Sequence, residues 1–280
     1  MPWIVPAVAD GPRADHDGPM TTDRNPAAST PDDAPRALVT GASTGIGQAT
    51  VRHLVRAGYR VLASARREDR LAALAEETGC DTFAADLTSD EQVTALADHA
   101  RSLGPLKSLV HIAGGAIGAD RVEDGRVEDW SRMYDINVLS TLRLTQALLD
   151  HLRADGGGDI LVLTSTAAIA PYPGGAGYTA AKHAERMIPA TLRLELVGEP
   201  IRVIEIRPGL VETEEFSLNR YRGDAEAAAG VYAGVAEPLT ADDCAEVVTF
   251  SLTLPDHVNL DEVVIRPRAQ ASNTVVHRER

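Results

Sequence analysis

Tyr178 and Lys182, in the run Tyr178-Thr179-Ala180-Ala181-Lys182, are the residues whose types and spacing most clearly suggest chemistry. This spacing places both side chains on one face of a helix, one turn apart. A phenol is a poor acid or base at neutral pH, because its ordinary pKa is about 10. A cation beside it favours the phenolate and lowers that pKa, so the pair is predicted to act as a general acid and base. The alternative is a surface lysine beside a half-buried tyrosine.

A glycine-rich turn follows the apolar run 36–40 and leads into an expected helix. Gly41 permits a tight turn, while Gly45 and Gly47 let the backbone approach a pyrophosphate at the helix N-terminus. Many such segments are only turns, but the position between a strand and a helix favours phosphate binding here. The predicted phosphate-binding residues are Gly41, Ser43, Thr44, Gly45, Ile46 and Gly47.

Two further strand ends carry side chains that suit a dinucleotide. The expected strand 60–65 is followed by Arg66 and Arg67, and not by the acidic residue that binds the ribose diol of NAD. Because arginine pairs with a 2′-phosphate, NADP is predicted over NAD, unless both arginines only begin a helix in solvent. Asp86 and Leu87 follow the third strand, where the carboxylate either accepts a hydrogen bond from adenine or only starts the next turn.

Strand-like and helix-like segments alternate along the chain after residue 35. Strands are also expected at 82–85, 106–112, 159–164, 201–206 and 262–266, and helices at 45–57, 67–78, 89–103, 130–152, 178–196 and 240–252. Pro189 should kink the helix 178–196, and residues 209–239 are expected to be loop-rich. The alternation predicts a single-domain α/β fold, with a doubly wound, Rossmann-like parallel sheet covered by helices on both faces. Ligands of such sheets bind at the carboxyl ends of the strands.

Composition narrows the possible functions. The chain has 280 residues, is 44% hydrophobic and carries a net charge of −14, so one large core is expected and a nucleic-acid partner is not. No apolar run is long enough to cross a bilayer, so no membrane partner is expected. Cys80 and Cys244 lie far apart in the sequence, which suits a reducing, cytoplasmic location. The histidines lack ligand spacing, and no metal site is expected.

These motifs together resemble the short-chain dehydrogenase/reductase family over about residues 36 to 266. Asn137 falls where the family keeps an asparagine on the fourth helix, and Ser165 falls at its catalytic serine. The resemblance implies that Tyr178 exchanges a proton with substrate, that Ser165 holds the substrate oxygen, and that Lys182 lowers the tyrosine pKa and binds the nicotinamide ribose. Asn137 would position a water that links Lys182 to solvent. The alternatives are an ordinary loop serine and a helix-bend asparagine.

The resemblance also implies a domain plan and further cofactor contacts. Residues 35–268 would be the dehydrogenase domain and 269–280 a C-terminal tail, while residues 1–34, rich in Pro, Asp, Ala and Gly, are expected from their composition to be a disordered extension. The family usually has Asn-Asn-Ala-Gly where this chain has His111-Ile112-Ala113-Gly114, so a contact of the two amides must be replaced. His111 would be either a core histidine or a group near the nucleotide. The further cofactor residues implied are Ala113, Gly114, Pro208, Gly209, Val211 and Thr213.

The later part of the chain resembles the NADP-dependent 3-hydroxy acid dehydrogenases within that family. The matching runs are 214–217, 220–224, 254–259 and 276–278. This resemblance implies oxidation of serine or related 3-hydroxy acids, or reduction of the semialdehydes, by a homotetramer. Arg220 and Arg222 are candidate partners of the substrate carboxylate, or else solvated loop charges. The competing hypotheses are a broad ketone or aldehyde reductase, a tailoring reductase of secondary metabolism, and an NADP-binding regulator without turnover.

Overall fold

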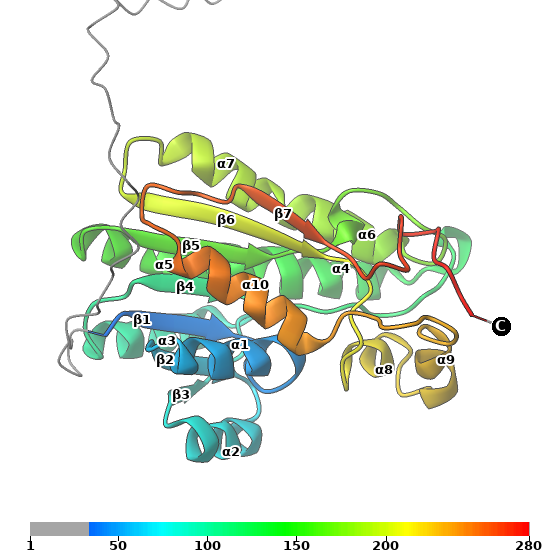
Figure 1. Cartoon of the computed structure of the whole chain (residues 1–280), viewed down its shortest axis with the longest axis horizontal. Helices are drawn as coiled ribbons and strands as arrows, with labels where there is room; N and C mark the ends of the chain where they lie inside the picture. The colour runs from blue at the N-terminus through cyan, green and yellow to red at the C-terminus, as the bar shows by residue number, and fades with distance from the viewer. Residues whose placement is uncertain (1–33, 280) are drawn as a thin grey trace, which may run out of the picture. The chain divides into compact units, whose positions relative to one another are not determined.

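The structure, a computed structural model, describes residues 34–279 of the chain. The predicted disorder of the N-terminal extension concerns residues 1–34, of which all but the last lie outside the described residues. Seven parallel strands form one sheet in the order β3-β2-β1-β4-β5-β6-β7 (Figure 1). The strand order reverses between β1 and β4, which is where ligands of such sheets bind. The strands are β1 (Arg36–Thr40), β2 (Arg60–Ala65), β3 (Asp81–Ala84), β4 (Ser108–His111), β5 (Gly158–Leu163), β6 (Ile201–Pro208) and β7 (Glu262–Ile265).

Helices cover both faces of the sheet, so the predicted doubly wound α/β fold is confirmed. One hydrophobic core joins the sheet to α3, α5 and α7. A second core joins the opposite face to α1, α2 and α10. The helices are α1 (Gly45–Arg56), α2 (Glu68–Thr78), α3 (Asp90–Ser102), α4 (Val127–Tyr134), α5 (Ser140–Ala154), α6 (Ala176–Glu185), α7 (Met187–Glu195), α8 (Phe216–Arg220), α9 (Ala225–Gly230) and α10 (Ala241–Thr253).

The expected helix 130–152 is three pieces in the structure. A π-helical turn, Asp135–Leu139, separates α4 from α5. At its centre the Asn137 side chain donates to the backbone oxygens of Met133 and Gly115, at 2.7 and 2.9 Å. This side chain ties the turn to the loop after β4, and π-turns of this kind often mark functional sites.

The expected helix 178–196 is likewise divided, into α6 and α7. Pro189 does lie in this segment, but the division falls at Arg186, before the proline. Pro189 has no N–H to donate to the carbonyl of Glu185, so the helical ladder loses a bond at that point. Glu185 is therefore the last residue of α6, and its backbone marks the break.

The segment 209–239, expected to be loop-rich, contains the two short helices α8 and α9. Helices of five and six residues show too little periodicity to be recognised from sequence. Asp224 caps α9, since its carboxylate accepts from the backbone N–H groups of Glu226 and Ala227. Both helices lie beyond the carboxyl end of the sheet (Figure 1).

The findings on membrane-spanning helices, metal sites and cysteines concern the described residues 34–279. Within them, no helix is both long and apolar enough to cross a membrane. No group of three His, Cys, Asp or Glu side chains in this part of the chain could hold a metal ion. Cys80 and Cys244 are buried free thiols.

Candidate active site

A cleft of about 990 Å³ lies at the carboxyl ends of the strands. The turns after β1 to β6, α6, the α8–α9 segment (residues 213–232) and the C-terminal tail all contribute to its walls. Asn137 and Arg222 are the predicted site residues that lie outside this lining. The lining includes Gly41, Ser43, Thr44, Gly45, Ile46, Gly47, Arg66, Arg67, Asp86, Leu87, Ala113, Gly114, Ser165, Tyr178, Lys182, Pro208, Gly209, Val211, Thr213 and Arg220.

The turn after β1 forms a tight backbone cradle. Gly41 and Gly45 have φ angles of +67° and +52°, a region that favours glycine. A Cβ on Gly47 would lie 2.2 Å from the Gly41 carbonyl oxygen, so α1 can begin this close to the turn only with glycine there. Thr44 precedes α1, and its buried hydroxyl has no hydrogen-bond partner among the described residues. A cradle at a helix N-terminus fits the pyrophosphate of a dinucleotide.

Arg67 projects from the end of β2 toward this cradle. Its Nη2 donates to Ser43 Oγ at 3.1 Å. The same guanidinium forms a two-pronged ion pair with Glu215, with Nη1–Oε1 at 2.7 Å and Nη2–Oε2 at 2.9 Å. Arg66 lies exposed on the cleft wall beside it. A pair of arginines at this strand end fits a 2′-phosphate, with Glu215 as a competing anion.

Asp86 lines the cleft and also starts a turn. Its Oδ1 accepts from the backbone N–H and the hydroxyl of Thr88, at 2.9 and 2.8 Å. Burial favours the neutral acid, but these hydrogen bonds and nearby arginines hold the pKa of the Asp86 carboxyl below its usual range. Asp86 therefore does start the next turn, through its two hydrogen bonds to Thr88. Its hydrogen bond to adenine stays a prediction.

Tyr178 and Lys182 lie one turn apart on α6, as their spacing predicts, and both are buried. The Lys182 Nζ lies 5.9 Å from the centre of the Tyr178 ring. The ring of Phe216, from α8, packs edge-on against Tyr178 at 5.7 Å between centres. Burial raises the pKa of the Tyr178 phenol, and Lys182 opposes that rise. Lys182 thus acts on the phenol in the predicted direction, but removal from water outweighs the cation and the pKa of Tyr178 is raised overall.

Ser165 stands at the end of β5, where the backbone is extended. Its Oγ accepts from the Ala167 N–H at 3.1 Å and donates to the Pro208 carbonyl at 3.5 Å. Hydrogen bonding with Ser165 also acts to lower the pKa of Tyr178. Ser165 and Tyr178 both line the cleft, and the shared binding of a substrate oxygen by the two hydroxyls stays a prediction.

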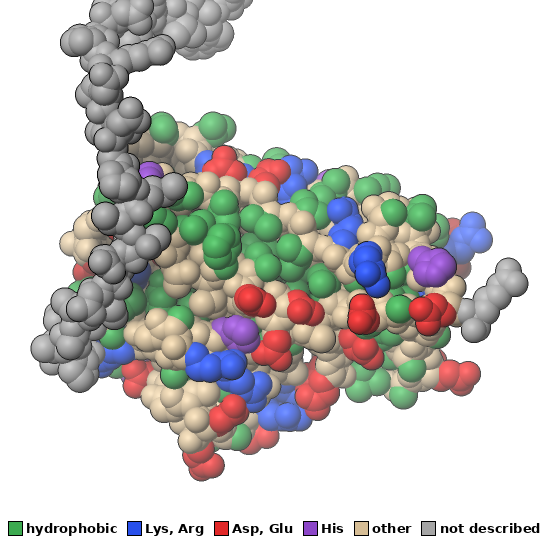
Figure 2. All heavy atoms as spheres, in the orientation of Figure 1, with side chains coloured by type: hydrophobic (Ala, Val, Ile, Leu, Met, Phe, Trp, Pro, Cys, Tyr) green, Lys and Arg blue, Asp and Glu red, His purple; other side chains and the backbone are tan. Residues whose placement is uncertain are grey.

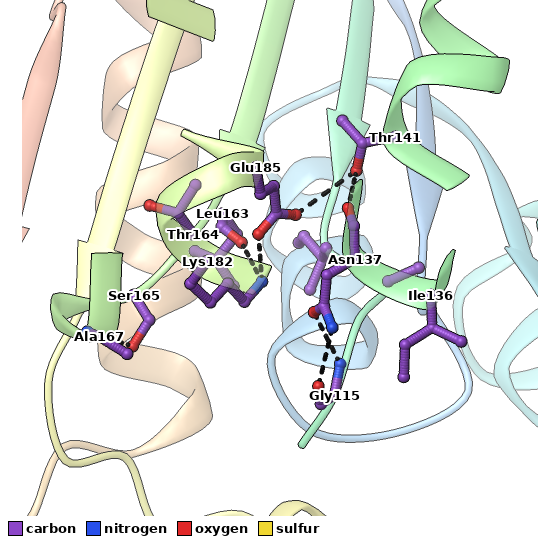
Figure 3. A network of polar contacts seen from close by, with 12 residues as sticks. Gly115, Ile136, Asn137, Thr141, Leu163, Thr164, Ser165, Ala167, Lys182 and Glu185 are labelled. Carbon is purple, nitrogen blue, oxygen red and sulfur yellow. Dashed lines mark hydrogen bonds and ion pairs between the residues drawn. The ribbon is translucent and has the colours of Figure 1, made fainter. Parts of the chain in front are cut away.

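Asn137 lies behind the cleft and is fully buried. Besides its two donated bonds, its Oδ1 accepts from the Gly115 N–H at 3.0 Å, which fixes the loop after β4 (Figure 3). A Cβ on Gly114 would lie 2.6 Å from this Oδ1 and 3.3 Å from Lys182 Nζ. Glycine at 114 thus allows the loop after β4, Asn137 and Lys182 to lie close together. The predicted water link between Asn137 and Lys182 stays a prediction.

Glu185 is a site residue that the sequence prediction missed. Its carboxylate Oε2 lies 2.6 Å from Lys182 Nζ, and only 1% of the residue is exposed (Figure 3). The Lys182 ammonium also donates to the Leu163 carbonyl at 3.4 Å. Glu185, together with Tyr178, keeps the pKa of Lys182 above its usual value despite burial. The sequence signal was a glutamate three residues after the lysine, a spacing that places both on one helix face.

Of the two residues that stand in place of asparagines, His111 belongs to the core, whereas Ile112 lines the cleft. His111 is buried, shares a hydrogen bond with the Thr145 hydroxyl at 3.0 Å, and does not line the cleft. Burial lowers the pKa of His111 to about 3, so it is a neutral core histidine, as the first alternative held. The Thr40 hydroxyl accepts from the N–H groups of Ile112 and Ala113, at 3.0 and 3.1 Å. These bonds connect the ends of β1 and β4.

The two candidate substrate arginines are placed differently. Arg220 lines the cleft, where its Nη1 donates to the Tyr172 hydroxyl at 2.9 Å and its Nη2 to the Gly174 carbonyl at 3.0 Å. Its buried Nε has no hydrogen-bond partner among the described residues. Arg222 is exposed and pairs with Asp129 and Asp120 outside the cleft lining.

The C-terminal tail closes one side of the cleft, a role that the sequence did not indicate. Gln270 Oε1 accepts from the Leu210 N–H at 2.8 Å, next to the predicted nicotinamide loop. Asn273 Nδ2 donates to the carbonyls of Thr166 and Ala170, just after Ser165. Both residues line the cleft.

Comparison with known proteins supports the family resemblance that the sequence motifs indicate. The family model described as short chain dehydrogenase matches residues 35–221. The chain belongs to the short-chain dehydrogenase family. As a short-chain dehydrogenase it is an oxidoreductase that acts on CH–OH groups.

This short-chain dehydrogenase has similar relatives with and without an assigned activity. It is 55% identical over 236 residues to an uncharacterized oxidoreductase of Mycobacterium tuberculosis, covering 84% of this chain and 92% of the relative. It is 37% identical over 248 residues to the NADP-dependent 3-hydroxy acid dehydrogenase of Salmonella typhi, covering 86% and 98%. Among solved structures, the closed form of serine dehydrogenase complexed with NADP⁺ aligns with a TM-score of 0.82 at 34% identity, covering 87% of this chain and 100% of that chain.

Proposed function

We propose that this short-chain dehydrogenase transfers a hydride between NADP and a small 3-hydroxy acid or its semialdehyde. The observation that carries the substrate class is Arg220, a guanidinium on the cleft wall whose charge acts on the Tyr178 phenol. Arginine binds carboxylates through paired hydrogen bonds, so it would hold the acid group while the hydroxyl faces Tyr178. The names of the relatives, a 3-hydroxy acid dehydrogenase and a serine 3-dehydrogenase of Agrobacterium fabrum at 38% identity, agree with this class.

NADP is proposed over NAD on the strength of Arg66 and Arg67 at the end of β2. The cradle at Gly41–Gly47 would take the pyrophosphate, and Asp86 with Leu87 would meet the adenine. Ala113 and Gly114, together with the loop from Pro208 to Thr213, would border the nicotinamide half. When bound, the nicotinamide supplies or accepts the hydride.

The chain's own residues would handle the proton. In reduction, Tyr178 would donate its phenolic proton to the developing alkoxide, and in oxidation the phenolate would accept the hydroxyl proton. Ser165 would donate a hydrogen bond to the same oxygen, which stabilises the charge that develops there. Lys182 would stabilise the phenolate, and Asn137 would hold the Gly114–Gly115 backbone in place.

A substrate panel tests the proposal. The full-length protein is assayed for NADP⁺ and NAD⁺ reduction with 3-hydroxy acids and with neutral alcohols. We expect turnover of a 3-hydroxy acid with NADP⁺ and much weaker turnover with NAD⁺. Turnover of neutral alcohols alone would contradict the hydroxy-acid assignment and favour a broad or tailoring reductase. Tight NADPH binding without any turnover would favour the regulator.

Replacing Arg220 with glutamine is expected to raise KM for a 3-hydroxy acid about 10-fold or more, because a hydrogen bond to a charged group contributes about 1.5–3 kcal/mol. The KM for a neutral alcohol should change little. Arg222→Gln is a matched control, since Arg222 lies two residues further along the chain and outside the cleft lining. Thermal unfolding checks that loss of the Arg220–Tyr172 bond leaves the fold intact. Equal effects of Arg220→Gln on acids and alcohols would contradict the assignment.

We also propose that the enzyme is a cytoplasmic homo-oligomer, with a tetramer favoured. Hydrophobic side chains gather over α10 and β7 on the face drawn in Figure 2. Phe250 of α10 is 58% exposed and Val264 of the edge strand β7 is 40% exposed. Side chains of this kind are often covered by another subunit. Light scattering should give about four times the chain mass of 29.7 kDa, and a monomer would contradict the proposal.

A further inference from the structure

The carboxylate of Glu185 is enclosed on all sides by protein. Glu185 Oε2 pairs with the Lys182 ammonium at 2.6 Å, and this oxygen has no other polar partner within the described part of the chain. Glu185 Oε1 faces the hydroxyl of Thr141, on α5, at 3.5 Å. A buried carboxylate with so few hydrogen bonds is costly to the fold. Such a group is retained more readily when its charge serves a neighbour, and the neighbour here is Lys182.

The position of Glu185 also limits where the ammonium can go. Figure 3 shows the end of the Lys182 side chain reaching toward both the Glu185 carboxylate and the Leu163 carbonyl. Lysine has a flexible stem and a compact charge, so it needs such anchors to stay in one place. Glu185 follows Lys182 on the same face of α6, where that helix ends, and the break before α7 fixes its backbone.

We propose that Glu185 is a positioning residue of the reaction: it anchors the Lys182 ammonium, and its charge decides how firmly the site holds the Tyr178 proton. The inference rests on the proposed acid–base role of Tyr178 and Lys182. It adds to that role a third ionisable group, which touches neither substrate nor cofactor and acts through the lysine.

The charges around the site give the direction of the effect. Lys182 and Tyr178 lie with Glu185 on α6, Glu205 acts from β6, and Arg220 acts on Tyr178 from α8. Burial raises the pKa of Glu185 to about 7, although Lys182 opposes the rise. As the pH rises, the carboxyl therefore loses its proton before the phenol does. The phenolate must then form beside an added negative charge, which disfavours it.

Glu185→Gln removes this charge and keeps the shape of the side chain. The phenolate of Tyr178 should then form about one to three pH units lower than in the wild type. The measurement is the ultraviolet absorbance of phenolate in the cofactor-free full chain, as the difference between each protein and the same protein with Tyr178→Phe. The acidic limb of alcohol oxidation should move in the same direction. Glu195→Gln, on an exposed glutamate of α7, is the matched control and should shift neither curve.

A second variant separates charge from anchoring. Glu185→Asp keeps the charge on a shorter arm, so its phenolate titration should stay near that of the wild type while kcat falls. A folded Glu185→Gln protein with an unshifted phenolate titration would overturn the proposal. If the Glu185→Gln protein does not fold, Glu185→Asp tests the proposal in its place. Because this variant keeps the charge, phenolate formation about one to three pH units lower than in the wild type would overturn the proposal. A shifted titration in a protein that turns over no substrate would support the role of Glu185 and contradict the proposed function alone.

Discussion

Replacing Tyr178 with phenylalanine is expected to lower kcat by about 100- to 10,000-fold, the usual contribution of a positioned general acid or base. The phenol is buried at the cleft end, with Lys182 and Ser165 acting on its charge, so no water molecule takes its place easily. Phenylalanine keeps the ring, its packing against Phe216 and the shape of α6. The loss should therefore appear in kcat, and NADPH binding should change by less than about threefold, because the missing proton is needed only in the transition state.

Steady-state kinetics with the best substrate of the panel measures this effect, and NADPH fluorescence measures binding. Tyr134→Phe is the matched control, since Tyr134 is 45% exposed on α4 and does not line the cleft. The control should keep full activity. A Tyr178→Phe enzyme with more than about a tenth of the wild-type kcat would show that another group supplies the proton, contrary to the prediction.

Much of the fold could be predicted because burial and hydrogen bonding leave marks in local sequence. All six residues of β5 are buried, and the segment accordingly contains an apolar run. Ser89 caps α3 by accepting from the Gln92 N–H, and Thr240 forms a capping box with Asp243 at α10, as polar residues before a helix predict.

The helix breaks could not be placed, because they depend on groups far away in the chain. The π-turn at Asn137 exists because its side chain bonds to Gly115 in the loop after β4, and sequence periodicity carries no sign of that contact. Pro189 correctly predicted an irregularity in the helix expected at 178–196. It did not show that the division would fall at Arg186.

The cleft was easier to predict than its electrostatics. Parallel strands bring their carboxyl ends to one edge, so residues that follow different strands meet there whatever their distance in sequence. Glu185 was not predicted as a site residue because a glutamate three residues from a lysine usually forms an exposed ion pair that contributes little to stability. Its burial depends on the packing of α6 against the π-turn and on Thr141 of α5.

The different surroundings of Arg220 and Arg222 could not be predicted from the sequence either. The sequence treats them alike, but α8 ends at Arg220 and Arg222 adopts a φ of +54°. This left-handed conformation turns the chain away, and Arg222 pairs with Asp129 and Asp120. The two guanidinium groups thus have different surroundings, although the residues are only two positions apart, and only Arg220 lines the cleft.

Replacing Arg67 with alanine is expected to raise KM for NADP⁺ about 10- to 100-fold and to leave KM for NAD⁺ nearly unchanged. The basis is the loss of charge-assisted hydrogen bonds to a 2′-phosphate, each contributing about 1.5–3 kcal/mol. The measurement is kcat/KM for both cofactors at a saturating concentration of substrate. Because Arg66 stands beside Arg67 on the cleft wall, some preference for NADP⁺ should survive the single change.

The ion pair between Arg67 and Glu215 provides a second variant that distinguishes a phosphate-binding arginine from a structural one. Arg67→Ala and Glu215→Gln both break that pair, so they would have the same effect if Arg67 served only to hold the α8–α9 segment. If Arg67 binds the phosphate, Glu215→Gln frees the guanidinium from a competing anion, and KM for NADP⁺ should fall or stay level. Opposite effects of the two variants on NADP⁺ would therefore identify Arg67 as a phosphate-binding residue. A parallel rise in KM for NADP⁺ and NAD⁺ in both variants would show that the arginine is structural.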